Sequence, residues 1–242
     1  LIFTNNDSGY ETAIEFKKNG VEPIILDTRK EPNSETIEEA KILGIKIKYS
    51  YVVVAAKGYK KVNGAEIAKI SDNKNDLGVL ENINCDCICV SGFWTPTIHL
   101  ASQSGNKTKF DKDIDAFVPG ISKQNETTLG AANGKFTLEE TLKDSFNAGY
   151  ELSKKITNNN NKIPYPKVIE KNKTTHDKFW CVPLPKGKTY KRFLDFQNDV
   201  AVSDIELALK EGYRSIEHVK RYTTLGMATD QGKTSNLNGL QL

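Results

Sequence analysis

The sequence has few sulfur and imidazole side chains, and it has no long apolar run. It contains four cysteines, one methionine and three histidines, and its 34 basic and 31 acidic residues nearly balance. This balance argues against a nucleic-acid partner. No apolar stretch approaches the roughly 18 residues of a membrane helix, and no signal-peptide pattern opens the chain. We therefore expect a soluble, cytoplasmic protein without a nucleic-acid or membrane partner.

The cysteines and histidines are not spaced as a metal or catalytic site. Cys85, Cys87 and Cys89 alternate, which predicts a strand that carries all three thiols on one face. In such a strand the side chains lie about 6–7 Å apart, too straight for a compact zinc site. We interpret these cysteines as small buried apolar residues. No nucleophile or carboxylate stands at a catalytic spacing from a histidine, so we predict no catalytic residue and no metal ligand.

The pattern of apolar residues divides the chain into several parts. Strands over 1–3, 21–26 and 45–51 alternate with helices over 9–18 and 34–43, which predicts βαβ units and a parallel sheet. A hairpin over 51–70, broken at Lys57-Gly58 and Asn63-Gly64, is expected to cover one edge of that sheet. A strand over Cys85–Val90 and a helix near Leu138–Ala148 follow. We predict domains at 1–81, 82–156 and 176–242, with a linker at 157–175.

The turn after the first strand has the place of a dinucleotide-binding turn but not its composition. Between Thr4 and Gly9 the glycines that would let the backbone approach a pyrophosphate are mostly absent. Asp7 lies near the start of the helix, where its charge repels phosphate. Asp27 stands about 20 residues later, at the position of a ribose-binding acid. We interpret this unit as a degenerate nucleotide fold without a ligand.

A second glycine-containing turn lies further along the chain. Small residues from Gly130 to Gly134 precede the helix that begins near Leu138. Such residues let a helix N-terminus meet a pyrophosphate or ribityl chain. The alternative is a tight strand-to-helix turn without a ligand.

The segment Lys220–Asn236 is the densest group of polar side chains in the sequence. Ser203 and Ser215 are expected to begin two helices, and Gly226 to end the second. That second helix carries its cations and hydroxyls to its C-terminal end: Lys220, Arg221, Thr223 and Thr224. The next element opens with Gln231, Gly232 and Lys233, whose N–H groups and ammonium are suited to an anion such as a flavin phosphate.

The stretch Ser215–Asn236 closely resembles the corresponding stretch of the α subunit of heterotetrameric sarcosine oxidase, and SGFWTPTIHL at Ser91–Leu100 resembles another. In relatives of that family the last unit is a small ferredoxin-like domain with a [2Fe-2S] cluster on four cysteines. The equivalent positions here are Asp195, Gln197, Asp230 and Ser235. Because such clusters need thiolate ligands, the resemblance implies a clusterless domain that keeps the fold.

The resemblance also implies the fold class and the cofactor residues. The expected class is α/β, with pieces of a Rossmann-like, disulfide-reductase-like two-dinucleotide-fold flavoprotein before the small helical domain. The chain is then a central fragment that holds half of an NAD site. The cofactor-contacting positions that follow are Asn133, Leu138 and Glu140, with Gly130 and Ala132 in the turn. A folate domain is expected beyond the last residue.

The same resemblance implies an activity for the assembled complex. That complex demethylates sarcosine oxidatively to glycine with oxygen, and it yields hydrogen peroxide with formaldehyde or methylene-tetrahydrofolate. FAD is expected in the β subunit, FMN at the subunit interface and tetrahydrofolate in the C-terminal domain, with γ and δ subunits completing the assembly. Two alternatives stay open: a subunit of an opine, proline or cyanide-forming amino-acid dehydrogenase, and a non-catalytic assembly scaffold.

Overall fold

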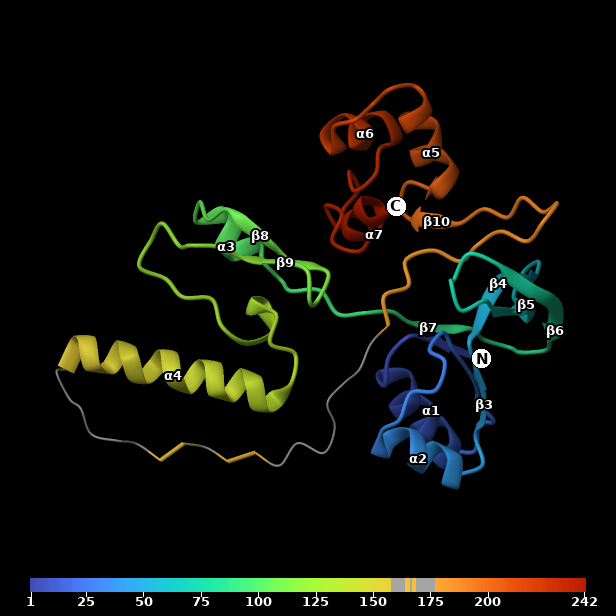
Figure 1. The fold of residues 1–242 in the computed structure, drawn as a ribbon, viewed down its shortest axis with the longest axis horizontal. Helices are drawn as coiled ribbons and strands as arrows, with labels where there is room; N and C mark the ends of the chain where they lie inside the picture. Colours follow the sequence, from blue (N-terminus) through green and yellow to red (C-terminus); the bar gives the residue numbers. More distant parts are fainter. Residues whose placement is uncertain (158–163, 166, 169–176) are drawn as a thin grey trace. The chain divides into compact units, whose positions relative to one another are not determined.

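The structure, a computed structural model, describes residues 1–157, 164–165, 167–168 and 177–242 (Figure 1). The chain forms two compact units. The first combines Leu1–Asn33, Ile37–Ser91 and Asp177–Leu242, and the second combines Ser34–Thr36 with Gly92–His176. Most of the linker predicted at 157–175 lies outside the described residues. The domain limits predicted from the sequence stay a prediction.

A four-stranded parallel sheet organises the first unit. Its strands lie in the order β3-β2-β1-β7. They are β1 (Ile2–Thr4), β2 (Ile24–Asp27), β3 (Lys46–Tyr49) and β7 (Cys89–Ser91), with the helices α1 (Ser8–Lys18) and α2 (Glu35–Ile42) as the crossovers. The predicted βαβ units and the α/β fold class are therefore confirmed.

Alternation of side chains gives this sheet two apolar faces. Ile2 and Ile25 are buried in one cluster with Ile14 of α1 and Ile37 of α2. Leu26, the neighbour of Ile25 in β2, packs in a different cluster on the opposite face. Each fully buried aliphatic side chain contributes about 1.5–3 kcal/mol relative to an exposed one. Burial on both faces accounts for the apolar strands β1 and β2.

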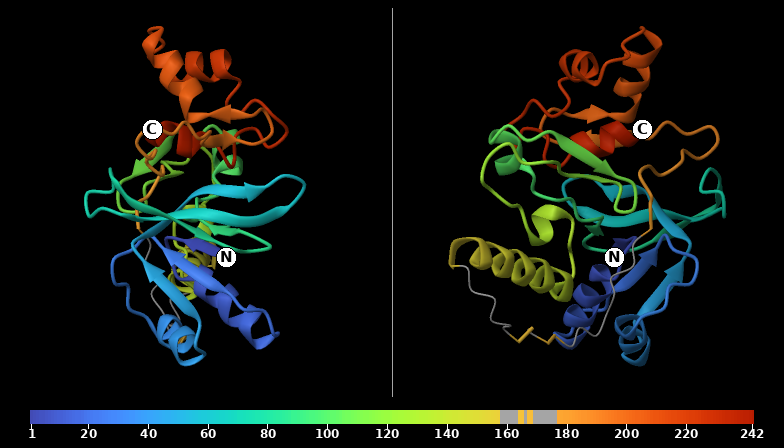
Figure 2. Two further views of the ribbon diagram at one scale, coloured as in Figure 1. Left: turned by 90° about the vertical axis from the view of Figure 1, so that its right-hand side faces the viewer. Right: turned by 60° about the vertical axis from the view of Figure 1, so that its left-hand side comes forward.

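A three-stranded antiparallel sheet covers the second face. It consists of β4 (Tyr51–Gly58), β5 (Val62–Ile70) and β6 (Leu77–Ile83). Figure 2 shows these strands, coloured cyan to teal, as a twisted ribbon. Ala65 and Ile67 of β5 pack with Leu26, so this sheet lies on a face of the parallel sheet and not along its edge. The predicted covering of an edge is therefore wrong. The turn predicted at Asn63-Gly64 is also wrong, because both residues are inside β5. A Cβ on Gly64 would lie 2.7 Å from the Ile83 carbonyl oxygen, so this glycine permits close approach of β6.

The second unit carries the glycine turn. Its elements are α3 (His99–Gln103), β8 (Thr108–Asp111), β9 (Ala116–Pro119), the short 3₁₀ helix η1 (Gly130–Asn133) and α4 (Leu138–Thr157). The helix α4 extends nine residues past the predicted end at Ala148. Glu139 and Glu140 in its first turn, and Lys154 and Lys155 in its last, complement the helix dipole and stabilise that length.

The helical module, residues 193–242, ends the first unit. It contains β10 (Phe193–Asp195), β11 (Val200–Ala201), α5 (Val202–Lys210), α6 (Ile216–Thr223) and α7 (Asn236–Gln241). The predicted cap at Ser203 is wrong, because α5 already begins at Val202 and the Asp204 carboxylate accepts the Ala201 N–H at 2.8 Å. Helix α6 ends before Gly226, since Thr224 adopts the left-handed conformation with φ of 63°.

Candidate functional site

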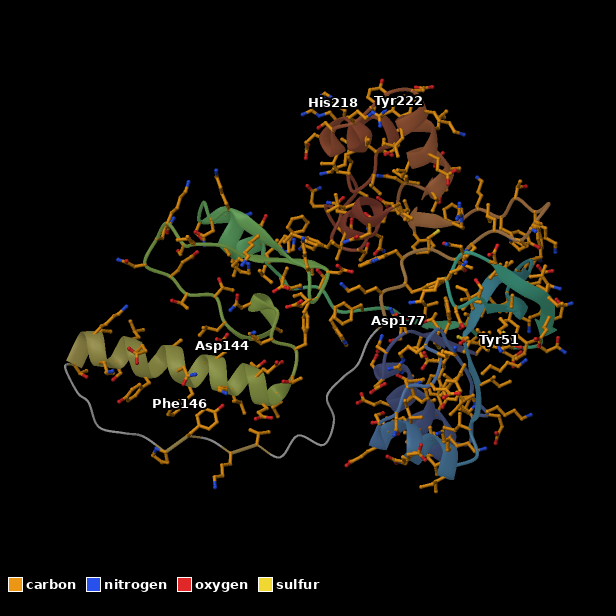
Figure 3. The ribbon with its side chains drawn as sticks, in the orientation of Figure 1. Tyr51, Asp144, Phe146, Asp177, His218 and Tyr222 are labelled. Atoms are coloured by element: carbon orange, nitrogen blue, oxygen red, sulfur yellow. The ribbon has the colours of Figure 1, made fainter. Side chains whose placement is uncertain are left out.

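The C-terminal end of α6 presents a group of cations. Lys220 and Arg221 lie in its last turn, on the helix that also carries His218 and Tyr222 (Figure 3). Lys220 is half-buried and its ammonium lies 3.9 Å from the Glu217 carboxylate. Arg221 and Lys233 are exposed, and neither makes an ion pair with another described residue. These cations remain available to an anionic ligand.

The hydroxyls beside these cations close the end of the helix. Thr223 Oγ1 donates to the Val219 carbonyl at 2.7 Å and accepts the Leu225 N–H at 3.3 Å. Thr224 Oγ1 donates to the Thr223 carbonyl at 2.6 Å. Both hydroxyls therefore stabilise the turn from α6 into the following loop.

The turn predicted to hold an anion already contains one, the carboxylate of Asp230. Asp230 Oδ1 accepts the Gly232 N–H at 3.0 Å, and Oδ2 accepts both the N–H and the hydroxyl of Thr234, at 3.2 and 2.7 Å. The Thr234 hydroxyl, with these two backbone N–H groups, lowers the pKa of Asp230. Gln231 is also engaged, since its N–H and its amide each donate to the Ala228 carbonyl at 2.9 Å. The turn therefore offers its backbone donors to Asp230, and an external phosphate would have to meet Lys233 instead.

Asp195 joins two loops of the helical module. It is buried, and Oδ1 accepts the N–H groups of Gln197 and Asn198 at 2.9 and 3.3 Å. Its other oxygen accepts the Gly226 N–H at 3.0 Å, and Gln197 Oε1 accepts the Thr229 N–H at 3.1 Å. Asp195 and Gln197, two of the four positions that the resemblance equates with cluster cysteines, thus hold the loops together by hydrogen bonds.

These side chains do not fit an iron–sulfur cluster. Such clusters are bound by thiolates, and at these four positions the donors are oxygens, three of which already accept backbone N–H groups. The fourth residue, Ser235, is fully buried and its Oγ has no hydrogen-bond partner among the described residues. The module therefore maintains its fold through its own polar side chains.

The glycine turn of the second unit is shaped by contacts with α4. Gly130 has a φ of 62°, which favours glycine, and a Cβ there would lie 2.8 Å from Thr141 Cγ2. Its N–H donates to Asp144 Oδ2 at 3.0 Å (Figure 3). Ala132 and Asn133 are half-buried in the same short helix. Close packing on α4 therefore accounts for the glycine, and an acid already accepts its N–H.

Glu140, in the first turn of α4, exchanges two hydrogen bonds with the Thr137 hydroxyl, which precedes the helix. The Glu140 N–H donates to Thr137 Oγ1 at 3.2 Å, and the Thr137 hydroxyl donates back to the Glu140 carboxylate at 2.9 Å. The carboxylate is exposed, so one oxygen remains accessible beside the exposed Leu138. The structure places Leu138 and Glu140 in the first turn of α4, directly after the glycine turn.

The order of strands in the parallel sheet reverses between β1 and β7, and open α/β sheets bind ligands at such a switch point. Hydrogen bonds join the residues after β1 to Ser91, at the end of β7, across this switch point. Asn6 Nδ2 donates to Ser91 Oγ at 3.3 Å, and the hydroxyls of Ser8 and Ser91 lie 2.7 Å apart. Gly9 allows α1 to approach β1, since a Cβ there would lie 2.6 Å from Thr4 Cβ.

A buried ion triad joins Asp7 and Asp27, the two acids that the sequence comparison with a nucleotide fold singled out, to Arg29. Arg29 Nη1 lies 2.7 Å from Asp7 Oδ1, and Nη2 lies 2.8 Å from Asp27 Oδ2. The Tyr10 hydroxyl donates to Asp27 at 2.6 Å, and burial together with the Asp27 charge raises the pKa of Tyr10 far above its ordinary range. Sequence reasoning did not assign Arg29 a role, although its place two residues after Asp27 is the signal for this contact. These residues do not fit a dinucleotide, because Asp7 is anionic where a phosphate would lie.

Within the described ranges, no group of three or more His, Cys, Asp or Glu side chains is arranged to hold a metal ion. In these same ranges, no helix combines the length and the apolar character that a membrane span requires.

Comparison with known proteins identifies relatives of the chain. It is 34% identical, over its whole length, to a sarcosine oxidase subunit alpha of Rhizobium meliloti (strain 1021), and covers 23% of that protein. It is 28% identical over 98% of its length to the subunit of Corynebacterium sp. (strain P-1), of which it covers 25%. The chain thus spans about a quarter of the length of these relatives.

A solved structure and a family model extend the comparison. The L-proline dehydrogenase of P. horikoshii resembles the fold with a TM-score of 0.50 at 16% identity, over 90% of this chain and 43% of that one. At this identity the likeness concerns the fold alone, and it agrees with the predicted α/β class. Residues 189–242 match the model named sarcosine oxidase A3 domain. The resemblance predicted from the sequence is thereby confirmed: the chain is similar to sarcosine oxidase α subunits along its whole length, and residues 189–242 match the model of their A3 domain.

Proposed function

We propose that this chain is part of the α subunit of a sarcosine oxidase complex. That complex would demethylate sarcosine oxidatively to glycine, reduce oxygen to hydrogen peroxide, and release formaldehyde or methylene-tetrahydrofolate. The observation that carries the proposal is the 34% identity along the whole chain to a protein with that subunit name. In this proposal the chain supplies cofactor-binding and interface surfaces, and the amine is oxidised in a β subunit.

The helical module is proposed to form part of the FMN interface. Arg221 and Lys233 are exposed cations, and Lys220 is paired only at 3.9 Å, so the three supply positive charge to a flavin phosphate. Backbone donors of the turn are not expected to take part, because Asp230 engages them. FMN, when bound, supplies the transfer of electrons to oxygen. The role of this chain would be to hold its phosphate and to exclude water from one side.

NAD is proposed to contact the start of α4. Leu138 presents an exposed apolar surface, Glu140 retains an accessible carboxylate oxygen, and Asn133 lies in the turn before them. An exposed apolar side chain beside a carboxylate suits the base and ribose hydroxyls of a nucleotide. Gly130 and Ala132 would shape the turn and leave the pyrophosphate to another glycine loop. FAD, tetrahydrofolate, the β, γ and δ subunits and a cytoplasmic location complete the proposal.

The test uses the full-length protein purified with its native partners. Replacing Lys220 and Lys233 by alanine is expected to lower the FMN content per complex, and sarcosine-dependent peroxide formation should fall in proportion. Lys210→Ala provides a matched control, because Lys210 is an exposed cation at the end of the neighbouring helix α5. Unchanged FMN content in the double variant would contradict the assignment of this surface.

Two measurements on the complex test the nucleotide and the activity separately. Acid extraction tests for bound NAD, and oxidation assays with different amines test the activity. Stoichiometric NAD in the acid extract supports the proposed site and excludes a scaffold without cofactor. Oxidation of proline or an opine in place of sarcosine would indicate the related dehydrogenases. If sarcosine is oxidised but no NAD is recovered, the activity stands and the nucleotide site is wrong.

A further inference from the structure

The thiols of Cys87, which precedes β7, and of Cys89, the first residue of β7, lie closer together than the sequence predicts. The expected strand Cys85–Val90 begins only at Cys89, so the preceding residues are not extended as a strand. The predicted spacing of the thiols on a straight strand is therefore wrong for Cys87 and Cys89. Their sulfur atoms are 3.9 Å apart, within hydrogen-bonding distance for two thiols.

The two thiols differ in exposure, and this difference assigns them different roles. Cys87 is exposed, whereas Cys89 is half-buried. Cys89 is also fixed by the sheet, since its N–H donates to the Leu1 carbonyl at 2.8 Å and it pairs with Ile2 of β1. An accessible thiol next to a held one is the arrangement in which a reactive cysteine has a resolving partner.

The other two cysteines have different surroundings. Cys85 packs at the apolar cluster of Leu26, Ala65 and Ile67, and burial raises the pKa of its thiol. Cys181 has no neighbouring cysteine: Arg192 Nη1 lies 3.1 Å from its sulfur, and the thiol donates to the Val182 carbonyl at 3.6 Å. Cys181 therefore serves as an internal reference for a cysteine without a thiol partner.

We propose that Cys87 and Cys89 form a redox-active pair, a modification site that peroxide converts reversibly to a disulfide. The Cys87 thiolate attacks one oxygen of hydrogen peroxide, the O–O bond breaks, and a sulfenic acid and hydroxide form. The Cys89 sulfur then attacks the sulfenic sulfur, the S–S bond forms, and the S–O bond breaks with release of water. Overall, two thiols and one peroxide give one disulfide and two water molecules. A dithiol reductant reverses the reaction by thiol–disulfide exchange.

A metal site is the weaker interpretation of this pair. Zinc and similar soft ions take three or four protein ligands. In the described parts of the chain, no group of at least three His, Cys, Asp or Glu side chains is arranged for that purpose. Oxidation needs only the two sulfur atoms that the structure brings together.

The inference goes beyond the proposed function and does not rest on it, because the peroxide is added. The natively purified protein is treated with hydrogen peroxide, blocked with N-ethylmaleimide without reduction, and digested. We expect the peptide that contains Cys87 and Cys89 to lose the mass of two hydrogen atoms, and fragmentation to place the link between these two residues. Free thiol at the pair should disappear roughly tenfold or more faster than at Cys181, because exposure and a resolving partner favour oxidation.

Conservative variants decide between the pair and its neighbours. In Cys87→Ser and in Cys89→Ser the loss of two hydrogen masses should vanish, whereas Cys85→Ser and Cys181→Ser should retain it. Circular dichroism spectra of all four variants check that they fold. The proposal is overturned if peroxide yields only sulfinic acid at Cys87, if a Cys85–Cys87 link forms in the unaltered protein, or if the link resists a dithiol reductant.

Discussion

The Asp195 carboxylate accepts the backbone N–H of Gly226 at 3.0 Å, and this bond joins the loop after β10 to the loop after α6. Both groups are buried, so neither can be satisfied by water when the other is removed. The same carboxylate accepts two further N–H groups, at Gln197 and Asn198. One side chain therefore satisfies three backbone donors of the helical module.

Replacing Asp195 by alanine is expected to destabilise the protein. It leaves the buried Gly226 N–H without an acceptor and removes two more charge-assisted hydrogen bonds, so we expect a loss of about 2 kcal/mol or more. Urea unfolding measures this loss. Asp199→Asn is the control, since Asp199 is exposed, has a positive φ, and asparagine tolerates that conformation. Equal stability of the two variants would show that Asp195 does not hold the loops together.

Asp230 should give the helical module a pH-dependent stability. Its pKa in the folded chain lies below the ordinary value of 3.8, chiefly because the Thr234 hydroxyl donates to it. A lowered folded-state pKa means that the ionised group stabilises the turn above the ordinary value, and that this contribution disappears as the pH falls through the lowered pKa. Asp230→Asn should therefore unfold at a lower temperature than the unaltered protein at neutral pH.

The same comparison at acid pH tests the sign of the effect. The difference in melting temperature between Asp230→Asn and the unaltered protein should shrink as the pH falls from about 5 to about 2.5. Melting curves recorded by circular dichroism across this range provide the measurement. A difference that grows on acidification would contradict the assigned role of the ionised carboxylate.

The elements of the parallel sheet could be predicted from sequence because their apolar residues are confined to short runs between helical patterns. The limits of β7 could not. Its length is set by pairing with β1, so the strand begins where it meets Ile2 and not where the apolar run begins. Similarly, the apolar pattern of β5 indicates which of its sides is buried, but not which element that side packs against. The hairpin was predicted to lie along an edge of the parallel sheet, and it lies on a face of that sheet.

The candidate site was predictable in its residue types and less so in its chemistry. Lys220 and Arg221 lie at a helix end as expected, because amphipathic periodicity fixed the helix. From the sequence alone, the N–H groups of the following turn are predicted to be available for an external anion. The pattern Asp-x-Gly-x-Thr at Asp230–Thr234 already contains the acceptor, since a short acid two residues before an N–H commonly forms such a bond. Internal acceptors have to be considered before a ligand.

The buried triad of the first unit should be sensitive to loss of its cation. Arg29→Met leaves Asp7 and Asp27 buried as uncompensated carboxylates, with exposed fractions of 1% and 0%. We expect a loss of about 3–5 kcal/mol, because breaking a buried ion pair leaves the remaining charge without a partner. Urea unfolding is the measurement, and Arg29→Lys should be intermediate, since lysine keeps the charge but not the fork of donors.

A neighbouring cation provides the control for this loss. Lys30 pairs with Asp72 at 3.1 Å, but both side chains are more than 70% exposed, so Lys30→Ala should change stability by less than about 0.5 kcal/mol. A similar loss in Lys30→Ala and Arg29→Met would mean that burial of the triad is not what stabilises this unit.

Glu140 offers a way to separate the start of a helix from a nucleotide contact. Its carboxylate and its N–H both form hydrogen bonds with the Thr137 hydroxyl, and the amide oxygen of a glutamine can accept from that hydroxyl as the carboxylate does. Glu140→Gln should therefore keep the melting temperature of the full-length protein, while Glu140→Ala should lose about 1 kcal/mol of stability with the hydrogen bond from Thr137. If the carboxylate also accepts hydrogen bonds from a ribose, Glu140→Gln should release NAD on gel filtration more readily than the unaltered protein. NAD retention equal to that of the unaltered protein would assign Glu140 to the helix start alone, and it would leave Asn133 and Leu138 as the residues to test for the nucleotide.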